Sequence, residues 1–508
     1  MLIVILLTSA NAFPQINGQI LLDDGNFSVV KLWGSHYDRG YAYGYLMADE
    51  IEDIYEGYLK QQFGSSLPLA KQIIQQGQML TIDSTYIYEA QGIYQGMVAA
   101  GVTITSGDYL DILVANTFLD ISGLLEHFGS KSLENGCSSL MTWGEAAAGT
   151  VDSGQCYISR HLDWDPHMKI INNQVMVIHI PSEPDEQPWA MIGFAGMMSC
   201  LSGVNAAGVS AFQHMLSDYN ETATMNAPYV PVWFALRDAL EKADYNGDGK
   251  SDVNDVRAAI AASANGFSNG YIVTSLALAD KQTDTLIAMV AEVCPSAPTH
   301  TYRYVDYPDN IPGKNLYAAN YEIKRNDHHH YCNRYNAVAA SFIDSTGISR
   351  FVNWEKMRLY SNSGAGNIQF MQFCPNDMEL LLARHNGGHP AYQNTPDTFY
   401  LNQLFSSPGG MTPLKTAPST MRLFPNPAHH NTTLELNLRK RGRISIMVFN
   451  MGGMLLQQFF VADVPDGLST VDMPLTGLPE GIYFVRVEGD DFVLDEKLLK
   501  ISGNYHNQ

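Results

Sequence analysis

A short stretch rich in Pro, Ser, Thr and Gly, residues 406–420 (SSPGGMTPLKTAPST), divides the chain into a long part and a short part. This composition predicts an extended linker. Beyond it, residues 421–508 contain short alternating apolar segments, separated by turn residues at roughly 8–12 residue spacing. That pattern is typical of a small β-sandwich. We therefore expect a large N-terminal body, a linker and a small all-β domain.

The long part changes character near its first third. Residues 13–136 are expected to be mostly helical, since stretches such as 67–95 place apolar residues at helix-like spacing. Residues 137–405 contain apolar runs bounded by Gly, Asp and Pro, which predict strands, together with helices over 232–242 and 253–262. The N-terminal body is therefore expected to be an α+β structure.

The charge balance excludes several classes of partner. The chain has 30 Lys and Arg against 52 Asp and Glu, a formal net charge of −22. Such a surface repels phosphate backbones and anionic lipid, so we expect no nucleic-acid partner. Hydrophobic residues make up 45% of the chain, which excludes disorder as its main state. The six cysteines lack CxxC spacing, which argues against a zinc ribbon or a disulfide scaffold.

The N-terminus has the pattern of a signal peptide. An apolar run over residues 2–7 is followed by Ala10-Asn11-Ala12, which fits the small-x-small cleavage rule. We expect residues 1–12 to be removed, although no basic residue precedes the run, so the true start can lie upstream. The alternative is a buried N-terminal strand. No later stretch reaches about 18 consecutive apolar residues, so no membrane-spanning segment is expected.

Residues 244–255 (DYNGDGKSDVND) have the spacing of an EF-hand-type loop. Oxygen-bearing side chains fall at the loop positions that bind Ca²⁺, and a glycine falls where the loop turns sharply. The expected ligands are Asp244, Asn246, Asp248, Lys250 through its backbone carbonyl, Asp252 and Asp255. Asp at the last position resembles the dockerin version of the loop, but dockerins carry two loops. We expect one structural calcium and no cofactor for catalysis; the alternative is an acidic turn between helices.

The strongest catalytic signal is a Gly-Cys pair followed by a predicted strand that carries Arg and Asp. Gly136-Cys137 precedes Arg160 by about 23 residues, and Asp163 follows three residues later. A thiol needs a base to ionise and a positive neighbour to stay ionised. If the bond between Gly136 and Cys137 breaks, the new α-amine of Cys137 can be that base. Arg160 would then lie by the sulfur, and Asp163 would orient the amine.

This pattern resembles the N-terminal-nucleophile hydrolases with a cysteine nucleophile. Among them it is most similar to the autoproteolytic acyltransferase/hydrolase family that includes penicillin acyltransferase, with choloylglycine hydrolases and acid ceramidase as wider relatives. Further motifs of that family are matched in order by residues 34–44, the turn at 204–208, Asn320 and Arg334. One departure is His161, which stands where the family usually has Asn.

The resemblance implies a four-layer αββα fold that is made by self-cleavage between Gly136 and Cys137. Residues 13–136, the pro-segment, would remain bound to residues 137–405, the catalytic segment. The resemblance also implies that Asn205 and Asn320 stabilise the oxyanion and that Arg334 supports the site.

The expected function is hydrolysis of a linear carbon–nitrogen bond in a small N-acyl amide, through a thioester on Cys137. An acyltransferase would use the same thioester and is the first alternative. The second is a calcium-stabilised surface binding protein without catalysis. Phospholipase-B-like proteins are a related third possibility, although they normally carry His where this chain has Arg160.

The C-terminal part, residues 421–508, carries Phe424-Pro-Asn-Pro427 and ends in Lys497-Leu-Leu-Lys-Ile. These motifs resemble the type A sorting domain of the type IX secretion system, a module of Bacteroidetes. The resemblance implies the secretion machinery as a partner and export through the outer membrane, with release or attachment at the cell surface. A carbohydrate-binding or adhesive sandwich is the alternative.

Overall fold

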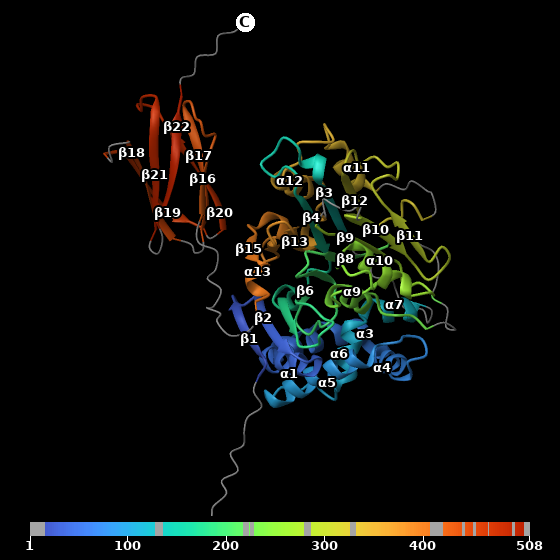
Figure 1. Cartoon of the computed structure of the whole chain (residues 1–508). Helices are drawn as coiled ribbons and strands as arrows, with labels where there is room; N and C mark the ends of the chain where they lie inside the picture. Colours follow the sequence, from blue (N-terminus) through green and yellow to red (C-terminus); the bar gives the residue numbers. More distant parts are fainter. Residues whose placement is uncertain are drawn as a thin grey trace, which may run out of the picture. The chain divides into compact units, whose positions relative to one another are not determined.

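The computed structural model describes residues 16–126, 136–216, 223, 228–278, 286–325, 332–406, 420–438, 442–450, 454–465, 467–489 and 493–501. The chain forms two units, which Figure 1 shows: one contains residues 1–391 and 399–413, and the other contains residues 414–508. The expected signal peptide and nearly all of the expected linker lie outside the described residues.

The first unit is built on two β-sheets. The nine-stranded sheet has the order β1-β2-β5-β6-β7-β8-β9-β10-β11 and is antiparallel except between β2 and β5. Its strands are β1 (Gly18–Asp23), β2 (Phe27–Gly34), β5 (Gln174–Pro181), β6 (Trp189–Phe194), β7 (Ser202–Asn205), β8 (Ser210–Met215), β9 (Tyr271–Leu276), β10 (Ala288–Val293) and β11 (His300–Arg303). The six-stranded sheet has the order β12 (Asn315–Ala318), β3 (Cys137–Trp143), β4 (Cys156–Asp163), β13 (Asn367–Cys374), β14 (Glu379–Arg384) and β15 (Asp397–Tyr400).

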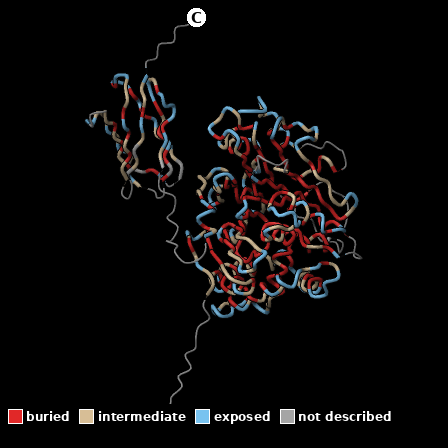
Figure 2. The backbone as a smooth tube through the Cα atoms, in the orientation of Figure 1, coloured by how far each residue is buried: buried red, intermediate tan, exposed pale blue. Residues whose placement is uncertain are grey.

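The two sheets lie face to face. Ser139 Oγ on β3 is 2.9 Å from Nε2 of His214 on β8, and Thr274 Oγ1 on β9 donates to the same hydroxyl at 3.1 Å. Every residue of β3 and β4 is buried, and Figure 2 shows mostly buried backbone through the centre of the unit. Polar side chains on these two strands must therefore find their partners within the protein.

Helices cover the outer face of each sheet. On the nine-stranded sheet, α1 packs on β1 and β2, α9 on β7 and β8, and α10 on β9 and β10. On the six-stranded sheet, α12 packs on β3 and β4, and α11 packs on α12. The order helices, sheet, sheet, helices confirms the predicted αββα fold. These helices are α1 (His36–Leu46), α9 (Val232–Glu241), α10 (Val253–Ala262), α11 (Asn333–Ala340) and α12 (Arg350–Tyr360).

The pro-segment is mostly helical, as predicted, and Figure 1 shows its helices in blue, gathered beside β1 and β2. After α1 come α2 (Ala48–Ile54), a π-helical turn (Tyr55–Leu59), α3 (Lys60–Phe63), α4 (Leu67–Gln76), α5 (Ser84–Ala99), α6 (Tyr109–Asn116) and α7 (Phe118–Glu126). α1 and α5 pack at glycines, because a Cβ on Gly44 would overlap the carbonyl of Ile93, and one on Gly96 would overlap that of Tyr41. The remaining short helices are α8 (Met168–Ile171) and α13 (Leu401–Leu404).

The stretch 67–95, which has helix-like spacing of its apolar residues, forms two helices, α4 and α5. Gly77 ends α4 in the left-handed conformation, with a φ of 63°, which glycine adopts without strain. Asp83 begins α5, since its side chain accepts the N–H of Thr85 at 2.8 Å. The apolar spacing continues across this break, so the periodicity alone did not locate it.

The second unit consists of two antiparallel sheets, which agrees with the predicted β-sandwich. Alternating residues of both sheets form its core, among them Leu434, Leu436, Ile446, Val448 and Val485. One sheet contains β16 (Thr420–Phe424), β17 (Asn431–Leu438) and β20 (Gly467–Pro474). The other contains β19 (Leu455–Val464), β18 (Gly442–Asn450), β21 (Gly481–Glu488) and β22 (Val493–Lys500). In the ranges described for both units, no helix has the length and apolar character needed to cross a membrane.

Candidate active site around Cys137

Cys137 is the first residue of β3, and it is 3% exposed. β3 pairs with β4 so that Cys137 lies opposite Leu162, and the Cys137 Sγ is 3.9 Å from the carbonyl oxygen of Asp163. Burial raises the pKa of the Cys137 thiol, and the charge of Arg160 opposes this effect. The thiol of the uncut chain is therefore protonated at neutral pH, and it needs a base before it can attack.

The peptide bond ahead of Cys137 lies against two charged side chains. A Cβ added to Gly136 would lie 3.3 Å from Asp163 Oδ2 and 3.4 Å from both Nη atoms of Arg334. The backbone N–H of Cys137 donates to Asn320 Oδ1 at 2.7 Å. The bond that self-cleavage would break is therefore next to a carboxylate, a guanidinium and a carboxamide.

Arg334, on α11, joins most of the predicted site residues into one group. Its Nη2 donates to Asn320 Oδ1 at 2.6 Å, and its Nη1 donates to the Cys137 carbonyl at 3.2 Å. The same Nη1 is 3.4 Å from Asp163 Oδ2. Asn320 Nδ2 donates to the carbonyl of Met215 at 2.8 Å, which fixes the orientation of the carboxamide. Residues from four separate parts of the sequence are thus brought into contact.

Arg160 is fully buried on β4. Its Nη2 donates to the carbonyl of Gln213 at 2.7 Å, and its guanidinium carbon lies 5.7 Å from the centre of the Phe212 ring. Its Nε and Nη1 have no hydrogen-bond partner among the residues that the structure describes. Burial lowers the pKa of Arg160, whereas the nearby Cys137 and Asp163 raise it. The Arg160 guanidinium, with two nitrogens that make no hydrogen bond to the described residues, therefore lies close enough to Cys137 to favour the thiolate form.

Asn205 is placed differently from the expectation. Its Nδ2 donates to the carbonyl of Leu240 and to Ser251 Oγ, both at 3.1 Å, and its Oδ1 accepts the N–H of Val209 at 2.9 Å. These bonds hold the turn between β7 and β8 against the end of α9. Asn205 is also absent from the residues that line the cavity beside Cys137. We therefore assign Asn205 to the turn and not to the oxyanion.

Cys137 forms part of the wall of a cavity in the first unit. The wall is almost entirely apolar, and both the pro-segment and the catalytic segment contribute to it. From the pro-segment come Ile54, Tyr58, Leu59, Ala115, Phe118 and Leu119. From the catalytic segment come, besides Cys137, residues that include Leu162, Trp164, Phe194, Met197, Gln213 and Trp233. An apolar group bound here would have its reacting carbon near the thiol.

Asn116, at the end of α6, was missed by the sequence analysis. Its Oδ1 accepts hydrogen bonds from Met198 N (2.7 Å), Ser199 N (3.0 Å) and Ser199 Oγ (2.8 Å), and its Nδ2 donates to the Gly196 carbonyl at 2.9 Å. The Gly196 N–H in turn donates to Tyr43 Oη at 3.0 Å. The pro-segment therefore holds the turn at 196–199 that forms part of the cavity wall. A polar residue directly after the apolar run at 112–115 was the signal available in the sequence.

The predicted calcium loop joins α9 to α10. Its Asp244 carboxylate accepts the N–H groups of Gly247, Asp248 and Gly249 at 2.8–3.0 Å. Its Asp255 carboxylate accepts the N–H groups of Tyr245, Asn246 and Asp252 at 2.7–3.0 Å. The buried Asp252 Oδ2 has no hydrogen-bond partner in the described part of the chain. A carboxylate oxygen that accepts one N–H keeps a further lone pair, so this donor set fits the oxygen ligands that Ca²⁺ prefers.

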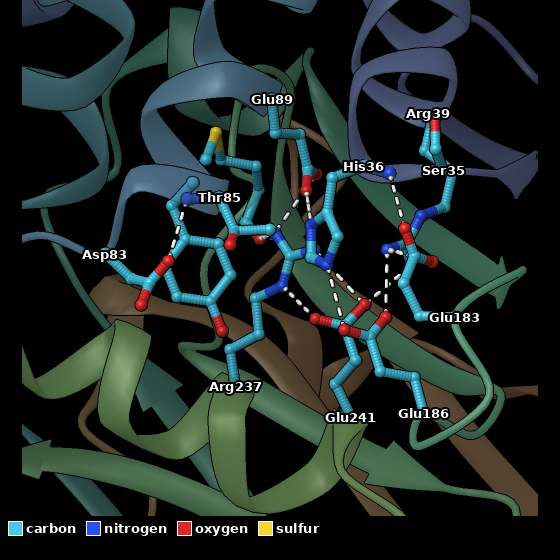
Figure 3. Close-up of polar contacts among 12 residues, drawn as sticks. Ser35, His36, Arg39, Asp83, Thr85, Glu89, Glu183, Glu186, Arg237 and Glu241 are labelled. Atoms are coloured by element: carbon cyan, nitrogen blue, oxygen red, sulfur yellow. Dashed lines mark hydrogen bonds and ion pairs between the residues drawn. The ribbon is translucent and has the colours of Figure 1, made fainter.

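A buried cluster of charged side chains joins the two segments away from Cys137, as Figure 3 shows. His36 Nδ1 is 2.7 Å from Glu89 Oε2, and its Nε2 is 3.0 Å from Glu186 Oε1. Arg237 donates to Glu89 at 2.6 Å and to Glu241 at 2.8 Å. Glu89 and His36 belong to the pro-segment, and the other three residues belong to the catalytic segment. The cluster therefore ties the two segments together.

Within the described ranges, His36, Glu183 and Glu186 have ligand atoms close enough together to hold a metal ion. Burial lowers the pKa of His36, but hydrogen bonds to Glu186 and Glu89 outweigh it and raise the pKa to about 9. A ring that is protonated at neutral pH offers no lone pair to a metal. We therefore interpret this group as an ion-pair cluster.

Comparison with known proteins identifies the C-terminal part of the chain. Residues 422–501 match the family model described as a secretion system C-terminal sorting domain. Residues 422–501 are a secretion sorting domain. This match confirms the sorting domain predicted from the sequence and indicates export by the type IX system, with release or attachment at the cell surface.

The remaining similarities are more distant. "Protein dcd1B" of Dictyostelium discoideum is 24% identical over 238 residues, which cover 43% of this chain and 44% of that protein. The chain therefore spans less than half the length of this curated relative. Among solved structures, a Caenorhabditis elegans N-acylethanolamine-hydrolyzing acid amidase ortholog is 14% identical, with a TM-score of 0.34, covering 47% of this chain and 93% of that one. A mutant conjugated bile acid hydrolase from Clostridium perfringens is 12% identical, with a TM-score of 0.31, covering 53% and 93%.

Proposed function

We propose that the chain is an exported cysteine amidohydrolase that first cuts its own Gly136–Cys137 bond and then hydrolyses linear N-acyl amides with an apolar acyl group. The observation that carries the proposal is the group of side chains around that bond. A buried thiol, an acid (Asp163) and two guanidinium groups (Arg160 and Arg334) meet there.

Self-cleavage is an acyl shift from nitrogen to sulfur. The Cys137 thiol loses its proton to Asp163, and the thiolate attacks the carbonyl carbon of Gly136. The carbon–nitrogen bond breaks, the nitrogen takes a proton to become the α-amine of Cys137, and Gly136 is left as a thioester on the sulfur. Water then hydrolyses the thioester and leaves a carboxylate on Gly136 and a free thiol. Asp163 suits the first step because burial raises its pKa to about 6, which lies close to neutral pH.

The hydrolysis of a substrate reuses the same atoms. The freed α-amine takes the thiol proton, the thiolate attacks the amide carbonyl, and the leaving amine takes that proton as it departs. Water then attacks the thioester, with the α-amine as its base, and releases the acid. The unused Nε and Nη1 of Arg160 provide positive charge next to the sulfur during both steps.

We assign the oxyanion donors to carboxamides that lie at the site. Asn320 remains one of them, because its Oδ1 holds it against Cys137 and Arg334, and its Nδ2 has a second hydrogen besides the one that it donates to the Met215 carbonyl. Gln213 takes the place that the sequence analysis gave to Asn205, since it lines the cavity with Cys137. Its Oε1 accepts from Trp233 Nε1 at 3.0 Å, and its Nε2 is 3.8 Å from the Met215 sulfur, a weak acceptor. Preplaced donors of this kind stabilise the charge that develops on the carbonyl oxygen.

The cavity supports an apolar acyl group as the substrate class. Gln213 and Cys137 are among its few polar side chains, and aromatic and aliphatic residues form most of the wall. Burial of apolar area stabilises a bound acyl chain by about 25 cal/mol per Å². A charged or strongly polar acyl group would lose its hydration here without gaining partners.

The first experiment is intact mass and N-terminal sequencing of the purified protein beside Cys137→Ala. We expect a fragment that begins at Cys137 in the wild type and an uncut chain in the variant. Cleaved protein is then assayed with para-nitroanilides of acyl chains of increasing length, with and without an added amine acceptor. An uncut wild type would refute self-cleavage and favour a binding protein. Transfer to the amine in preference to water would indicate the acyltransferase.

We also propose that the loop at 244–255 binds one structural calcium and that both segments stay together after cleavage. The donor set of Asp244, Asp252 and Asp255 supports the first part, and a bound Ca²⁺ would offset the repulsion among these carboxylates. The second part is supported by the pairing of β2 with β5 and by the buried charge cluster, both of which join the pro-segment to the catalytic segment.

A further inference from the structure

Two buried side chains lie directly behind the Asp163 carboxylate. His161 and Asp163 are two residues apart on β4 and so face the same side of the sheet. β13 pairs with β4 so that Asn367 lies opposite Asp163. Asn367 Nδ2 is 2.7 Å from Asp163 Oδ1 and 2.8 Å from His161 Nδ1. All three side chains are buried, so each of these contacts replaces one with water.

A single backbone carbonyl determines where the hydrogens lie in this group. His161 Nε2 is 3.1 Å from the carbonyl oxygen of Met357, and a carbonyl can only accept, so Nε2 carries the ring hydrogen. Burial lowers the pKa of His161 to about 3, so the ring is neutral and Nδ1 is an acceptor. The part of Asn367 that faces Nδ1 is therefore its amide NH₂, and this group also donates to Asp163 Oδ1.

We propose that His161 and Asn367 are positioning residues that hold Asp163 with Oδ1 occupied as an acceptor and Oδ2 turned toward the Gly136–Cys137 bond. The inference rests on the proposed function, because it concerns the acid–base group of that reaction. Oδ2 is the oxygen that lies next to Gly136, and it is therefore the atom that takes the proton from the thiol. His161 can hold this geometry because its ring is stacked on Phe370, with the ring centres 4.1 Å apart and the planes 9° apart.

The proposal predicts how substitutions shift the acidic limb of the pH profile of self-cleavage, which is the pH range in which the rate falls as Asp163 becomes protonated. The other titratable or charged groups that face Asp163 are Cys137, Arg160 and Arg334, and they stay unchanged in the variants. Asn367→Asp places a second carboxyl group beside Asp163. Two adjacent carboxylates repel, so one of them holds its proton to a higher pH. We expect the acidic limb to move up by at least about one pH unit.

His161→Phe keeps an aromatic ring on Phe370 but removes both ring nitrogens. Asn367 then loses its nearer second acceptor at 2.8 Å and keeps only the Gln369 carbonyl at 3.3 Å, so its carboxamide is held less firmly and can turn its oxygen toward Asp163. We expect the acidic limb to move in the same direction, by less than in Asn367→Asp. Because His161→Phe adds no charge to the interior, it tests the proposal even where Asn367→Asp does not fold.

The experiment measures the rate of self-cleavage of freshly synthesised full-length protein as a function of pH, by intact mass, because Asp163 takes the thiol proton in that step. The matched control is Asn353→Asp on α12, since Asn353 is equally buried and its hydrogen bonds go to Leu140, Thr142 and Ser159. We expect the two test variants to shift the acidic limb and the control to leave it in place. Wild-type limbs in both test variants, or an equal shift in the control, would overturn the positioning role. A wild type that neither cuts itself nor hydrolyses amides would instead refute the proposed function.

Discussion

Replacement of Asn116 by Ala is expected to weaken both the fold and the binding of apolar substrates. The substitution removes the acceptor of two buried backbone donors, Met198 N and Ser199 N, and the nearer acceptor of Ser199 Oγ, which keeps the Asn116 carbonyl at 3.3 Å. A buried donor left without a partner costs roughly 1–3 kcal/mol. Movement of the turn can satisfy part of this set, so we expect the free energy of unfolding to fall by about 3–5 kcal/mol. Such a loss is large against a total of about 5–15 kcal/mol for a domain.

The assay combines urea unfolding with the KM of two anilides that differ only in acyl length, N-decanoyl and N-acetyl. Because the turn lines the cavity, the KM of Asn116→Ala should rise for the long chain much more than for the short one. The control is Asn353→Ala, which also removes a buried, hydrogen-bonded carboxamide but lies on α12. A stability loss below about 1 kcal/mol, or a KM ratio equal to that of the control, would refute the reasoning.

Three further predictions follow from groups described above or from burial. Gly136→Ala should fold normally but cut itself more slowly than the wild type, because the added Cβ would lie 3.3 Å from Asp163 Oδ2. A rate of self-cleavage equal to that of the wild type, followed by mass spectrometry, would contradict this. Burial raises the pKa of Asp120 from 3.8 to about 7, so the folded state binds this proton more tightly and stability is lost as the pH rises through that window. As the pH rises from 3.8 to about 7, the free energy of unfolding of Asp120→Asn should therefore increase by up to about 4 kcal/mol relative to that of the wild type, as measured by urea unfolding. A difference between the two proteins that does not change with pH would argue against this. Removal of calcium by EGTA should lower the melting temperature of the wild type but not that of Asp248→Ala, and equal effects in both would count against the calcium site.

The core of the candidate site could be predicted because its residues lie on two neighbouring strands. Cys137 begins β3, and Arg160 and Asp163 lie on β4, its partner in the sheet. A short stretch of sequence therefore already holds three members of the group in a fixed relation. Asn320 and Arg334 are far from these strands in the sequence, and only the ordered set of family motifs indicated them.

The failures share a physical cause, which is that the role of an amide depends on what packs against it. Asn205 has the motif of an oxyanion donor, but α9 and Ser251 occupy its NH₂ group. Asn116 has no motif, and its partners lie about 80 residues further along the chain. A local sequence pattern does not predict which residues from distant parts of the chain pack against a side chain.

The division of the cavity wall between the two segments has a consequence for how this protein can change. The thiol and its neighbours come from residues after Gly136, whereas Tyr58, Phe118 and other wall residues come from before it. Part of the cavity wall is therefore encoded in a stretch of the gene that does not encode the thiol. Exchange of the first stretch between homologous proteins would give hybrids that keep one reaction and differ in the molecules they accept. Under the proposed function, substitutions before Gly136 could change which acyl groups bind while the residues around Cys137 stay the same.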